Sequence, residues 1–255
     1  MKKIIIFSII SLFLLILTSC GASKNLSYYS YKSYGKEYVN INGMGGCQDL
    51  ELVVPNKVDG KKVLEIATAA FRGSKIISVK TLKTMHRIGS SAFANCSRLT
   101  YADFTQSQSL DDLGSGAFEN CYSLEKVSFY KEAPLKEIES RCFANCIKLT
   151  VVNFSKRTEK IGNEAFFSCS SLTQLELPNA LQSIGSKAFA DCFELARLVI
   201  SDSIQSIASD AFDNCLHLER LHYRGTVEEW SKVDFTPTEN SRIIEVVCSD
   251  GVYKF

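Results

Sequence analysis

Histidine is scarce in this sequence, and the motifs that usually place catalytic groups are missing. The 255 residues include only three histidines, His86, His217 and His222, which are too few and too scattered to suggest a catalytic array. Serine is common, but no G-x-S-x-G nucleophile turn occurs. The glycine-rich stretch GMGG at 43–46 matches neither a phosphate-binding loop nor a dinucleotide fingerprint. These absences argue against an enzyme, a metal site and a bound cofactor.

Net charge is also small, and long hydrophobic runs are few. The chain carries 29 lysines and arginines against 28 aspartates and glutamates, which gives a formal net charge of +1. A near-neutral chain offers no electrostatic reason to expect nucleic-acid binding. The one long apolar run, residues 4–17, is shorter than the ~20 residues that a membrane-spanning helix needs. We therefore expect neither a nucleic-acid partner nor a spanning helix.

The first twenty residues have the pattern of an export signal. Lys2 and Lys3 precede the apolar run, and the sequence LTSC, which ends at Cys20, follows it. LTSC resembles a bacterial lipobox, and this resemblance implies removal of residues 1–19 and attachment of lipid to Cys20. An uncleaved anchor is the alternative. The polar, tyrosine-rich residues 20–35 are predicted to be a tether, although their tyrosines leave open packing on the first turn of the fold.

One nine-residue phrase recurs along the chain. IGSSAFANC at 88–96 is followed by IGNEAFFSC, IGSKAFADC and IASDAFDNC. Its phenylalanine recurs every 22 to 25 residues, at Phe71, Phe93, Phe118, Phe143, Phe166, Phe189 and Phe212. An isoleucine or leucine stands five residues before each phenylalanine, and a leucine stands six residues after all but the first. A period of this length is typical of a repeat solenoid, in which stacked units bury a shared core.

Each unit is predicted to supply a strand, a turn and a short return segment. The stretch LTQLEL at 172–177 ends in the apolar alternation of a strand with one face on a core. Two residues past the phenylalanine, six of the seven units have Asn, Gly or Asp, which tolerate the left-handed backbone that ends a helical turn. We therefore predict an α/β solenoid with a parallel sheet on its concave face, short helical or 3₁₀ segments on its convex face, and a cap at each end.

The repeated pattern I-G-x-x-A-F-x-x-C-x-x-L-x-x-V-x-[FIL] resembles the BspA-like, or treponemal-type, leucine-rich repeat of bacterial surface proteins. The resemblance covers about residues 37–250, and the stretches 53–71 and 222–235 are similar to the opening and closing segments of that family. Two units depart from the pattern, with Ser74 in place of the cysteine and Cys142 in place of the alanine. The resemblance implies a leucine-rich repeat fold and a cell-surface role in adhesion or protein binding, commonly towards host matrix proteins or other cells.

These patterns divide the chain into five segments. Residues 1–19 are the predicted signal peptide, 20–35 the tether, 36–65 an N-terminal cap, 66–224 the solenoid of about seven units, and 225–255 a C-terminal cap. Trp230, Val233 and Phe235 are expected to cover the last unit, which would otherwise expose apolar surface and an unpaired strand edge.

Six of the ten cysteines recur once per unit, three residues after the phenylalanine, at Cys96, Cys121, Cys146, Cys169, Cys192 and Cys215. Units stacked about 4.8 Å apart would place them in a row with parallel Cβ directions, which do not converge to the ~3.8 Å Cβ separation of a disulfide. We therefore predict buried, reduced thiols that fill space in the core. Cys142 and Cys146 form C-x-x-x-C rather than the C-x-x-C of redox and zinc sites.

The outward-facing residues of the predicted strands are the candidate binding surface. In each strand the residues between core positions point away from the core, so stacked units present one continuous face whose positive charge gathers towards its C-terminal end. Solenoids commonly bind partners through such extended faces. The candidate contact residues are Tyr101, Lys126, Gln174, Glu176, Arg197, Arg220, His222 and Arg224.

Together these features predict a lipid-anchored protein at the outer surface of a bacterium, which binds other proteins in adhesion to host matrix or cells. The alternative is a structural or protein-interaction lipoprotein of the cell envelope that faces the periplasm. The predicted partners are a protein ligand and, through lipid on Cys20, a membrane. No enzymatic activity, cofactor, metal or nucleic-acid partner is expected.

Overall fold

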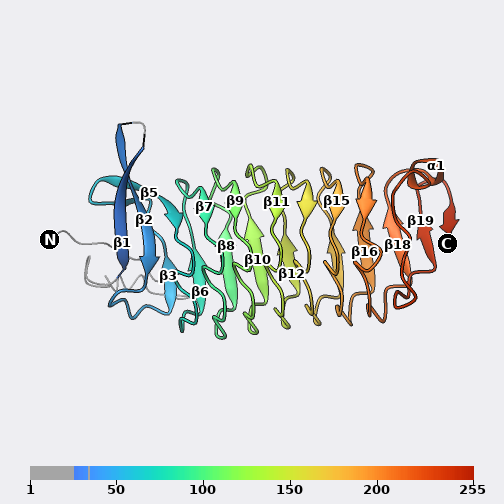
Figure 1. Ribbon diagram of the computed structural model, residues 1–255, viewed down its shortest axis with the longest axis horizontal. Helices are drawn as coiled ribbons and strands as arrows, with labels where there is room; N and C mark the ends of the chain where they lie inside the picture. Colours follow the sequence, from blue (N-terminus) through green and yellow to red (C-terminus); the bar gives the residue numbers. More distant parts are fainter. Residues whose placement is uncertain (1–25, 34) are drawn as a thin grey trace, which may run out of the picture.

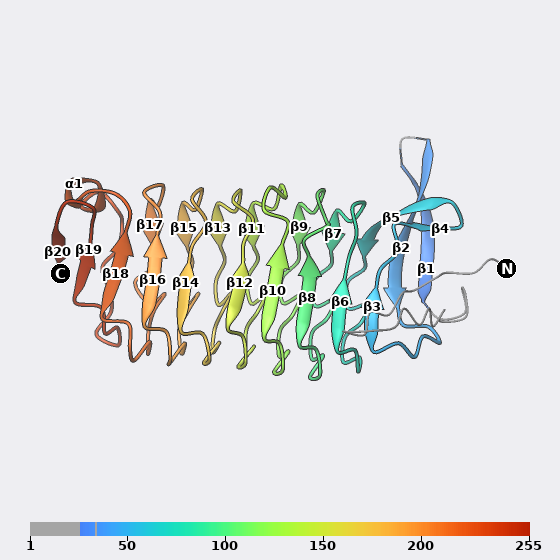
Figure 2. The same ribbon diagram turned by 180° about the vertical axis from the view of Figure 1, so that it is seen from behind.

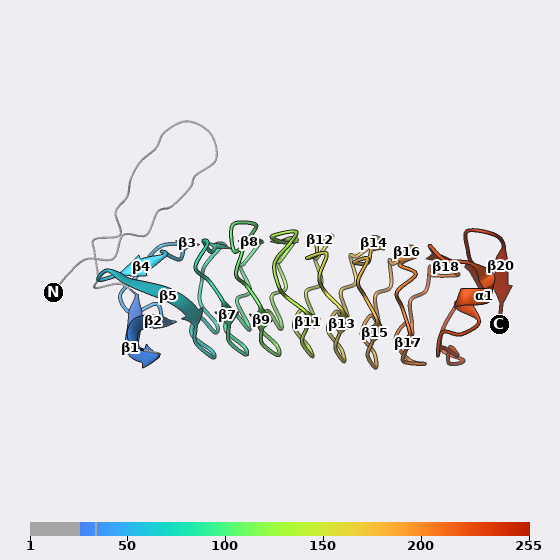
Figure 3. The same cartoon turned by 90° about the horizontal axis from the view of Figure 1, so that it is seen from above.

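The computed structural model describes residues 26–33 and 35–255 (Figure 1). The chain winds into an elongated rod of stacked turns, with its N-terminal strands at one end and its C-terminus at the other. Seen from above, the rod is nearly straight (Figure 3), so the predicted concave face is close to flat. The predicted signal peptide, residues 1–19, and Cys20 lie outside the described residues.

Strands that follow the repeated leucine form one long side of the rod, which we call the Leu sheet. These strands pair in parallel and in register, so that Val127 lies between Ala102 and Val152. The first part contains β3 (Glu51–Val53), β6 (Ser78–Lys80), β8 (Tyr101–Phe104), β10 (Lys126–Phe129) and β12 (Val151–Asn153). The second contains β14 (Gln174–Glu176), β16 (Arg197–Ile200), β18 (Arg220–Tyr223), β19 (Glu245–Val247) and the antiparallel β20 (Val252–Lys254). The predicted parallel sheet is confirmed.

Strands that end on the repeated isoleucine or leucine, together with β1 (Ser27–Ser33), β2 (Lys36–Gly43) and β4 (Lys57–Val58) at the N-terminal end, form a second side of the rod, which we call the Ile sheet. The strands that end on the repeated residue are β5 (Lys61–Ile66), β7 (Arg87–Ile88), β9 (Asp112–Leu113), β11 (Glu137–Ile138), β13 (Lys160–Ile161), β15 (Ser183–Ile184) and β17 (Ser206–Ile207). Figure 2 shows the two sets of strands as two rows. The predicted α/β class and helical convex face are therefore wrong. Among the described residues the one helix is α1 (Val227–Trp230), which lies outside the repeats.

Two left-handed residues in each of the first six repeated phrases, and one in the seventh, explain why no helix forms there. In the second unit, Ser91 with φ 54° and Asn95 with φ 61° flank Phe93. A right-handed helix cannot continue through residues in that region of backbone conformation. Instead, the Phe93 N–H donates a hydrogen bond of 2.8 Å to the Ala117 carbonyl of the next unit. We call the turns around the repeated phenylalanines the Phe turns. They add a third line of unit-to-unit hydrogen bonds beside the two sheets.

The seven repeated phenylalanines form a column through the core. All of them are buried, and the centroids of successive rings lie 5.2 to 5.7 Å apart with interplanar angles of 1 to 14°. Burial of one such ring contributes about 1.5–3 kcal/mol before conformational entropy is counted. At the C-terminal end, Phe235 meets the ring of Phe212 edge-on at 6.0 Å. The column predicted from the spacing is present.

The repeated glycine allows neighbouring turns to approach closely. A Cβ atom on Gly89 would lie 2.5 Å from the backbone nitrogen of Thr68, a separation that real Cβ atoms do not show. The first and seventh units have the small residues Ala67 and Ala208 at this position, and their strands stay paired. The fourth unit has Glu139, and the Ile sheet is interrupted at that point, between β9 and β11. Close stacking of backbone on backbone is therefore what the glycine of the phrase provides.

Both sheets extend into the segments that were predicted to be caps. At the N-terminal end, β1 and β2 form an antiparallel hairpin, and β2 pairs in parallel with β5 of the Ile sheet. Residues 27–33 thus form a strand where a tether was predicted. At the other end, β19 pairs in parallel with β18 and adds a further strand to the Leu sheet. The helix α1 buries Trp230 against Tyr223, with ring centroids 5.0 Å apart.

Candidate functional site

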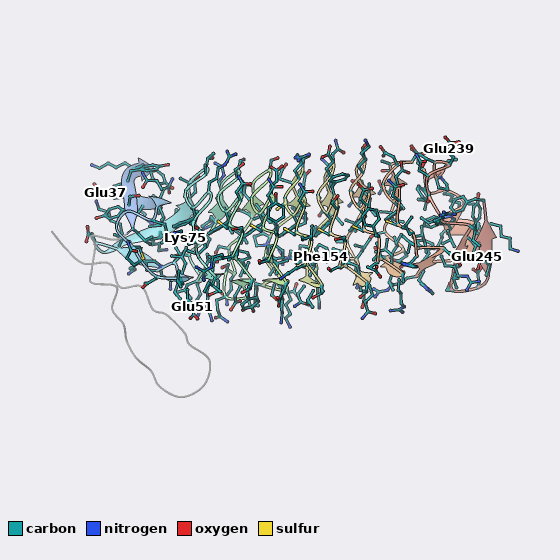
Figure 4. All side chains as sticks on the ribbon, turned by 90° about the horizontal axis from the view of Figure 1, so that it is seen from below. Glu37, Glu51, Lys75, Phe154, Glu239 and Glu245 are labelled. Atoms are coloured by element: carbon teal, nitrogen blue, oxygen red, sulfur yellow. The ribbon has the colours of Figure 1, made fainter. Side chains whose placement is uncertain are left out.

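The outward-facing row of the Leu sheet brings the eight candidate residues onto one face. Alternation along each strand produces this result: in β16 the side chains of Leu198 and Ile200 are buried, while that of Arg197 is exposed. Tyr101 lies on β8, Lys126 on β10, Gln174 and Glu176 on β14, Arg197 on β16, Arg220 and His222 on β18, and Arg224 directly follows β18. Side chains form regular rows along the rod, with Glu51 near one end, Phe154 near the middle and Glu245 near the other (Figure 4).

The positive charge expected at the C-terminal end of this face is largely neutralised. The Nε atom of Arg220 donates a hydrogen bond of 2.5 Å to Glu245 on β19. Arg224 reaches back across β16 to form an ion pair with Glu176 and a hydrogen bond with Asn179. Within the part of the chain that the structure describes, the side chain of Arg197 has neither an ion pair nor a hydrogen bond. It is therefore the arginine of this row that is available to an acidic partner.

Towards the N-terminal end, the face offers an aromatic ring with mixed charges around it. The ammonium group of Lys126 lies 5.7 Å from the ring centroid of Tyr101, within the range of a cation–π contact. Burial and the nearby Asp103 carboxylate raise the pKa of Tyr101, so its hydroxyl keeps its proton at neutral pH. Lys80 forms an ion pair of 3.4 Å with the same Asp103.

A groove of about 750 Å³ opens on this face where the Leu sheet is interrupted, between β12 and β14. Val151, Asn153 and Phe154 line one wall, Gln174 and Glu176 the other, and the lining set also includes Lys156, Pro178, Asn179, Arg197 and Arg224. Four of the eight candidate residues thus lie at the groove. The groove itself was not predicted from the sequence, nor were Phe154, Lys156 and Asn179 as part of it.

The repeated cysteines form a buried row, and each thiol has a defined hydrogen-bond partner. The Sγ atom of Cys121 donates to the Phe93 carbonyl oxygen at 3.1 Å, and that of Cys169 to the Phe143 oxygen at 3.2 Å. The same bond to the preceding unit recurs at Cys96, Cys146, Cys192 and Cys215. No disulfide joins these six residues, so the prediction of reduced thiols is confirmed. The cysteines also satisfy buried carbonyl oxygens, a role that the spacing did not reveal.

All of the repeated thiols except Cys96 are poor nucleophiles and poor metal ligands, because their pKa values are raised. Burial raises the pKa of the Cys215 thiol to about 12, and burial likewise raises the pKa values of Cys121, Cys142, Cys146, Cys169 and Cys192. At the end of the row, hydrogen bonds from Cys121 and Ser74 lower the pKa of Cys96. A thiol that stays protonated is a weak nucleophile and a weak metal ligand. The row is therefore a structural feature of the core.

The described residues contain neither a metal-binding cluster nor a membrane-spanning helix. No group of three or more His, Cys, Asp or Glu side chains in residues 26–33 and 35–255 is arranged to hold a metal ion. No helix within the same residues has the length and apolar character needed to cross a membrane.

Comparisons with known proteins agree with the repeat geometry. The family model of the BspA type leucine rich repeat region matches six copies over residues 46–171 and 136–254. A search of curated proteins found no match. Among solved structures, the leucine-rich repeat protein of T. pallidum is similar, with a TM-score of 0.52 and 24% identity over 77% of this chain and 82% of that one. A leucine-rich cell surface protein from Faecalibacterium prausnitzii has a TM-score of 0.38 and 16% identity, over 82% of this chain and 98% of that one. At these identities the structures show likeness of fold alone.

Proposed function

The chain belongs to the BspA-type leucine-rich repeat family, and on that premise we propose that it is a repeat protein of the bacterial surface-protein type, which binds a protein ligand through the outward residues of its Leu sheet. The family and the fold are those of protein-interaction repeats rather than of enzymes. The specific residues that make contact are part of the proposal.

The observation that carries the proposal is the contrast between the inside and the outside of the same strands. Inward positions repeat almost without change, as the column of phenylalanines and the rows of leucine and cysteine show. Outward positions differ from unit to unit: Tyr101, Lys126, Val151, Gln174 and Arg197 follow one another at one register position. Aromatic and arginine side chains are the types that most often anchor protein interfaces. A rigid row of unlike side chains is suited to recognising an extended partner surface.

We expect loss of two arginines and a histidine on this face to weaken binding. In an Arg197→Ala, Arg220→Ala, His222→Ala variant, the dissociation constant for a host matrix protein or cell surface should rise at least tenfold, about 1.4 kcal/mol. Surface plasmon resonance on a panel of purified matrix proteins, together with adhesion to cultured cells, measures the effect. An Arg87→Ala, Lys136→Ala, Lys160→Ala variant removes three cations on the side of the Ile sheet and should bind like the parent. Equal binding by both variants would remove the Leu sheet from the proposal.

Anchoring and location are proposals of the same kind, because Cys20 lies outside the described residues. The LTSC sequence supports lipid on Cys20. The BspA-type repeat supports an outward-facing protein that adheres to host matrix or cells. The alternative remains an envelope lipoprotein that faces the periplasm. Replacing Cys20 with alanine should shift the protein from the membrane fraction to the medium or the soluble fraction. Protease added to intact cells should digest the parent protein, and full protection would favour the periplasmic alternative.

A further inference from the structure

The groove between β12 and β14 differs from every other step of the Leu sheet. No backbone hydrogen bond joins these two described strands, whereas parallel pairing joins β10 to β12 and β14 to β16. The same two turns stay joined elsewhere: the Ser171 N–H donates to the Ile147 oxygen at 3.1 Å, and the Gln182 N–H to the Glu159 oxygen at 2.7 Å. The two turns are therefore separated only in the Leu sheet, between β12 and β14.

The exposed fractions of the core residues show the same local opening. Val152 is 9% exposed and Leu175 6% exposed, while the equivalent residues of the flanking strands, Val127 and Leu198, are fully buried. Pro178, which follows β14, contributes to the missing pairing because it has no N–H to donate. At the equivalent position Tyr130 donates to the Phe104 oxygen of the preceding turn at 3.1 Å.

The open edge of β14 presents backbone donors and acceptors to the groove. The Thr173 oxygen accepts from the Ala196 N–H, and the Leu177 N–H donates to the Val199 oxygen, so odd-numbered residues of this segment face β16. Because backbone groups alternate between the two edges of a strand, the N–H and C=O groups of Gln174 and Glu176 face the opposite way, towards β12. Unpaired strand edges are templates for pairing with a further strand.

The unpaired positive charge at the groove favours an acidic partner over a basic one. Arg197 lies beside Gln174 in the register of β14 and β16, and it is the cation here that lacks an acidic partner among the described residues. Arg224 is already paired with Glu176, and Lys156 lies 3.5 Å from Glu132. A carboxylate on a segment that runs along β14 would meet an unpaired guanidinium, which favours charge-assisted hydrogen bonds. A volume of about 750 Å³ is within the range of sites that bind small ligands or short segments.

We propose that this groove is a strand-addition site for an extended acidic peptide segment of a protein partner. The segment pairs its backbone with the open edge of β14, at Gln174 and Glu176, and directs a carboxylate to Arg197. Main-chain hydrogen bonds supply the affinity of such additions, and side chains at alternate positions supply the specificity. The inference rests on the proposed protein-binding function and specifies where on the Leu sheet the partner binds.

The test uses a synthetic probe and the full folded chain. An acetylated and amidated heptapeptide of alternating threonine and valine, with one central glutamate, is titrated into the ¹⁵N-labelled protein. We expect saturable shifts of the Gln174 and Glu176 amides. A matched peptide with lysine in place of the glutamate, a peptide N-methylated on its pairing edge, and the Arg197→Ala variant should each weaken binding at least tenfold. Arg98→Ala, an exposed arginine on a distant turn, is the control and should leave the titration unchanged.

The possible results distinguish failure of the strand-addition site from failure of the proposed protein-binding function. Absence of saturable shifts, equal binding of the N-methylated peptide, or shifts centred away from β12 and β14 would each overturn the strand-addition site. If matrix or cell binding by the parent protein persists and still depends on Arg197, Arg220 and His222, the protein-binding function stands without this groove. If that binding is absent as well, both proposals fail.

Discussion

Substitution of Phe166 by alanine is expected to lower the free energy of unfolding by about 3–5 kcal/mol, because it removes a large buried ring and leaves a cavity that the stacked turns cannot close. Phe166 is fully buried in the middle of the phenylalanine column. Its ring lies 5.2 Å from those of both Phe143 and Phe189. Loss of this ring therefore interrupts contacts with two neighbouring units at once. Urea unfolding followed by circular dichroism measures the change.

The matched control is Phe193, an exposed phenylalanine of the next unit. Its side chain is 41% exposed, so Phe193→Ala should change the free energy of unfolding by no more than about 0.5 kcal/mol. Similar midpoints for the parent and the Phe166→Ala variant would contradict the column as the main source of core stability. A large loss at Phe193 would show that outward side chains also contribute to holding the turns together.

A second large effect is expected at alkaline pH, where the buried cysteine row should destabilise the fold steeply. A cysteine in the unfolded chain titrates near its ordinary pKa of 9.0, whereas burial raises the pKa of Cys215 to about 12 in the fold. Above pH 9 the unfolded state therefore loses protons that the folded state keeps. The stability due to the Cys215 thiol is therefore fully present below pH 9 and is lost as the pH rises from about 9 towards 12, and the other thiols with raised pKa values act in the same direction.

The size of the effect follows from the number of thiols. One unit above the unfolded pKa, a thiol that burial keeps protonated costs on the order of 1 kcal/mol, so the six most deeply buried thiols with raised pKa values together cost several kcal/mol at pH 10. That loss is a large fraction of the whole stability of many domains, about 5–15 kcal/mol. Urea unfolding between pH 7 and pH 10, with reductant present, measures the slope.

A single cysteine substitution isolates the contribution of one thiol. Cys169→Ala removes one titrating group, so the stability lost between pH 8 and pH 10 should be smaller than in the parent by on the order of 1 kcal/mol, whatever the cost of the substitution at neutral pH. An unchanged alkaline slope in this variant, or a flat pH profile in the parent protein, would contradict burial of the cysteine row as protonated thiols.

The spacing of the sequence was enough to predict the repeat, the phenylalanine column, the parallel Leu sheet and the reduced cysteines, because each depends on one residue type returning in every unit. The Ile sheet was missed because its strands are only two residues long in the repeats, as in Arg87–Ile88, too short for an alternation to appear. The left-handed residues before the first six phenylalanines carried no consistent signal either, since Glu164 and Lys187 are not types that favour that conformation. A helical return was predicted in their place.

The candidate site was predicted in outline and missed in detail for a related reason. Residues at fixed register positions, such as Arg197 and Arg220, could be placed on one face from the repeat alone. Their partners could not: Glu245, which neutralises Arg220, belongs to β19, a strand outside the repeated phrase. The opening between β12 and β14 is a departure from the repeat, and Pro178 is its single signal in the sequence. Periodicity predicts what is common to all units, whereas the groove depends on what differs in one.

The proposed function depends above all on the outward face of the Leu sheet being the binding surface. Amide hydrogen exchange on the protein, alone and with the matrix protein or cell-surface ligand that it binds, compares this face with every other part of the fold in one experiment. We expect slower exchange concentrated in the strands from β8 to β18, with the largest protection at β12, β14 and β16 around the groove. Protection confined to the Ile sheet or to the Phe turns, with the Leu sheet unchanged, would contradict the proposal.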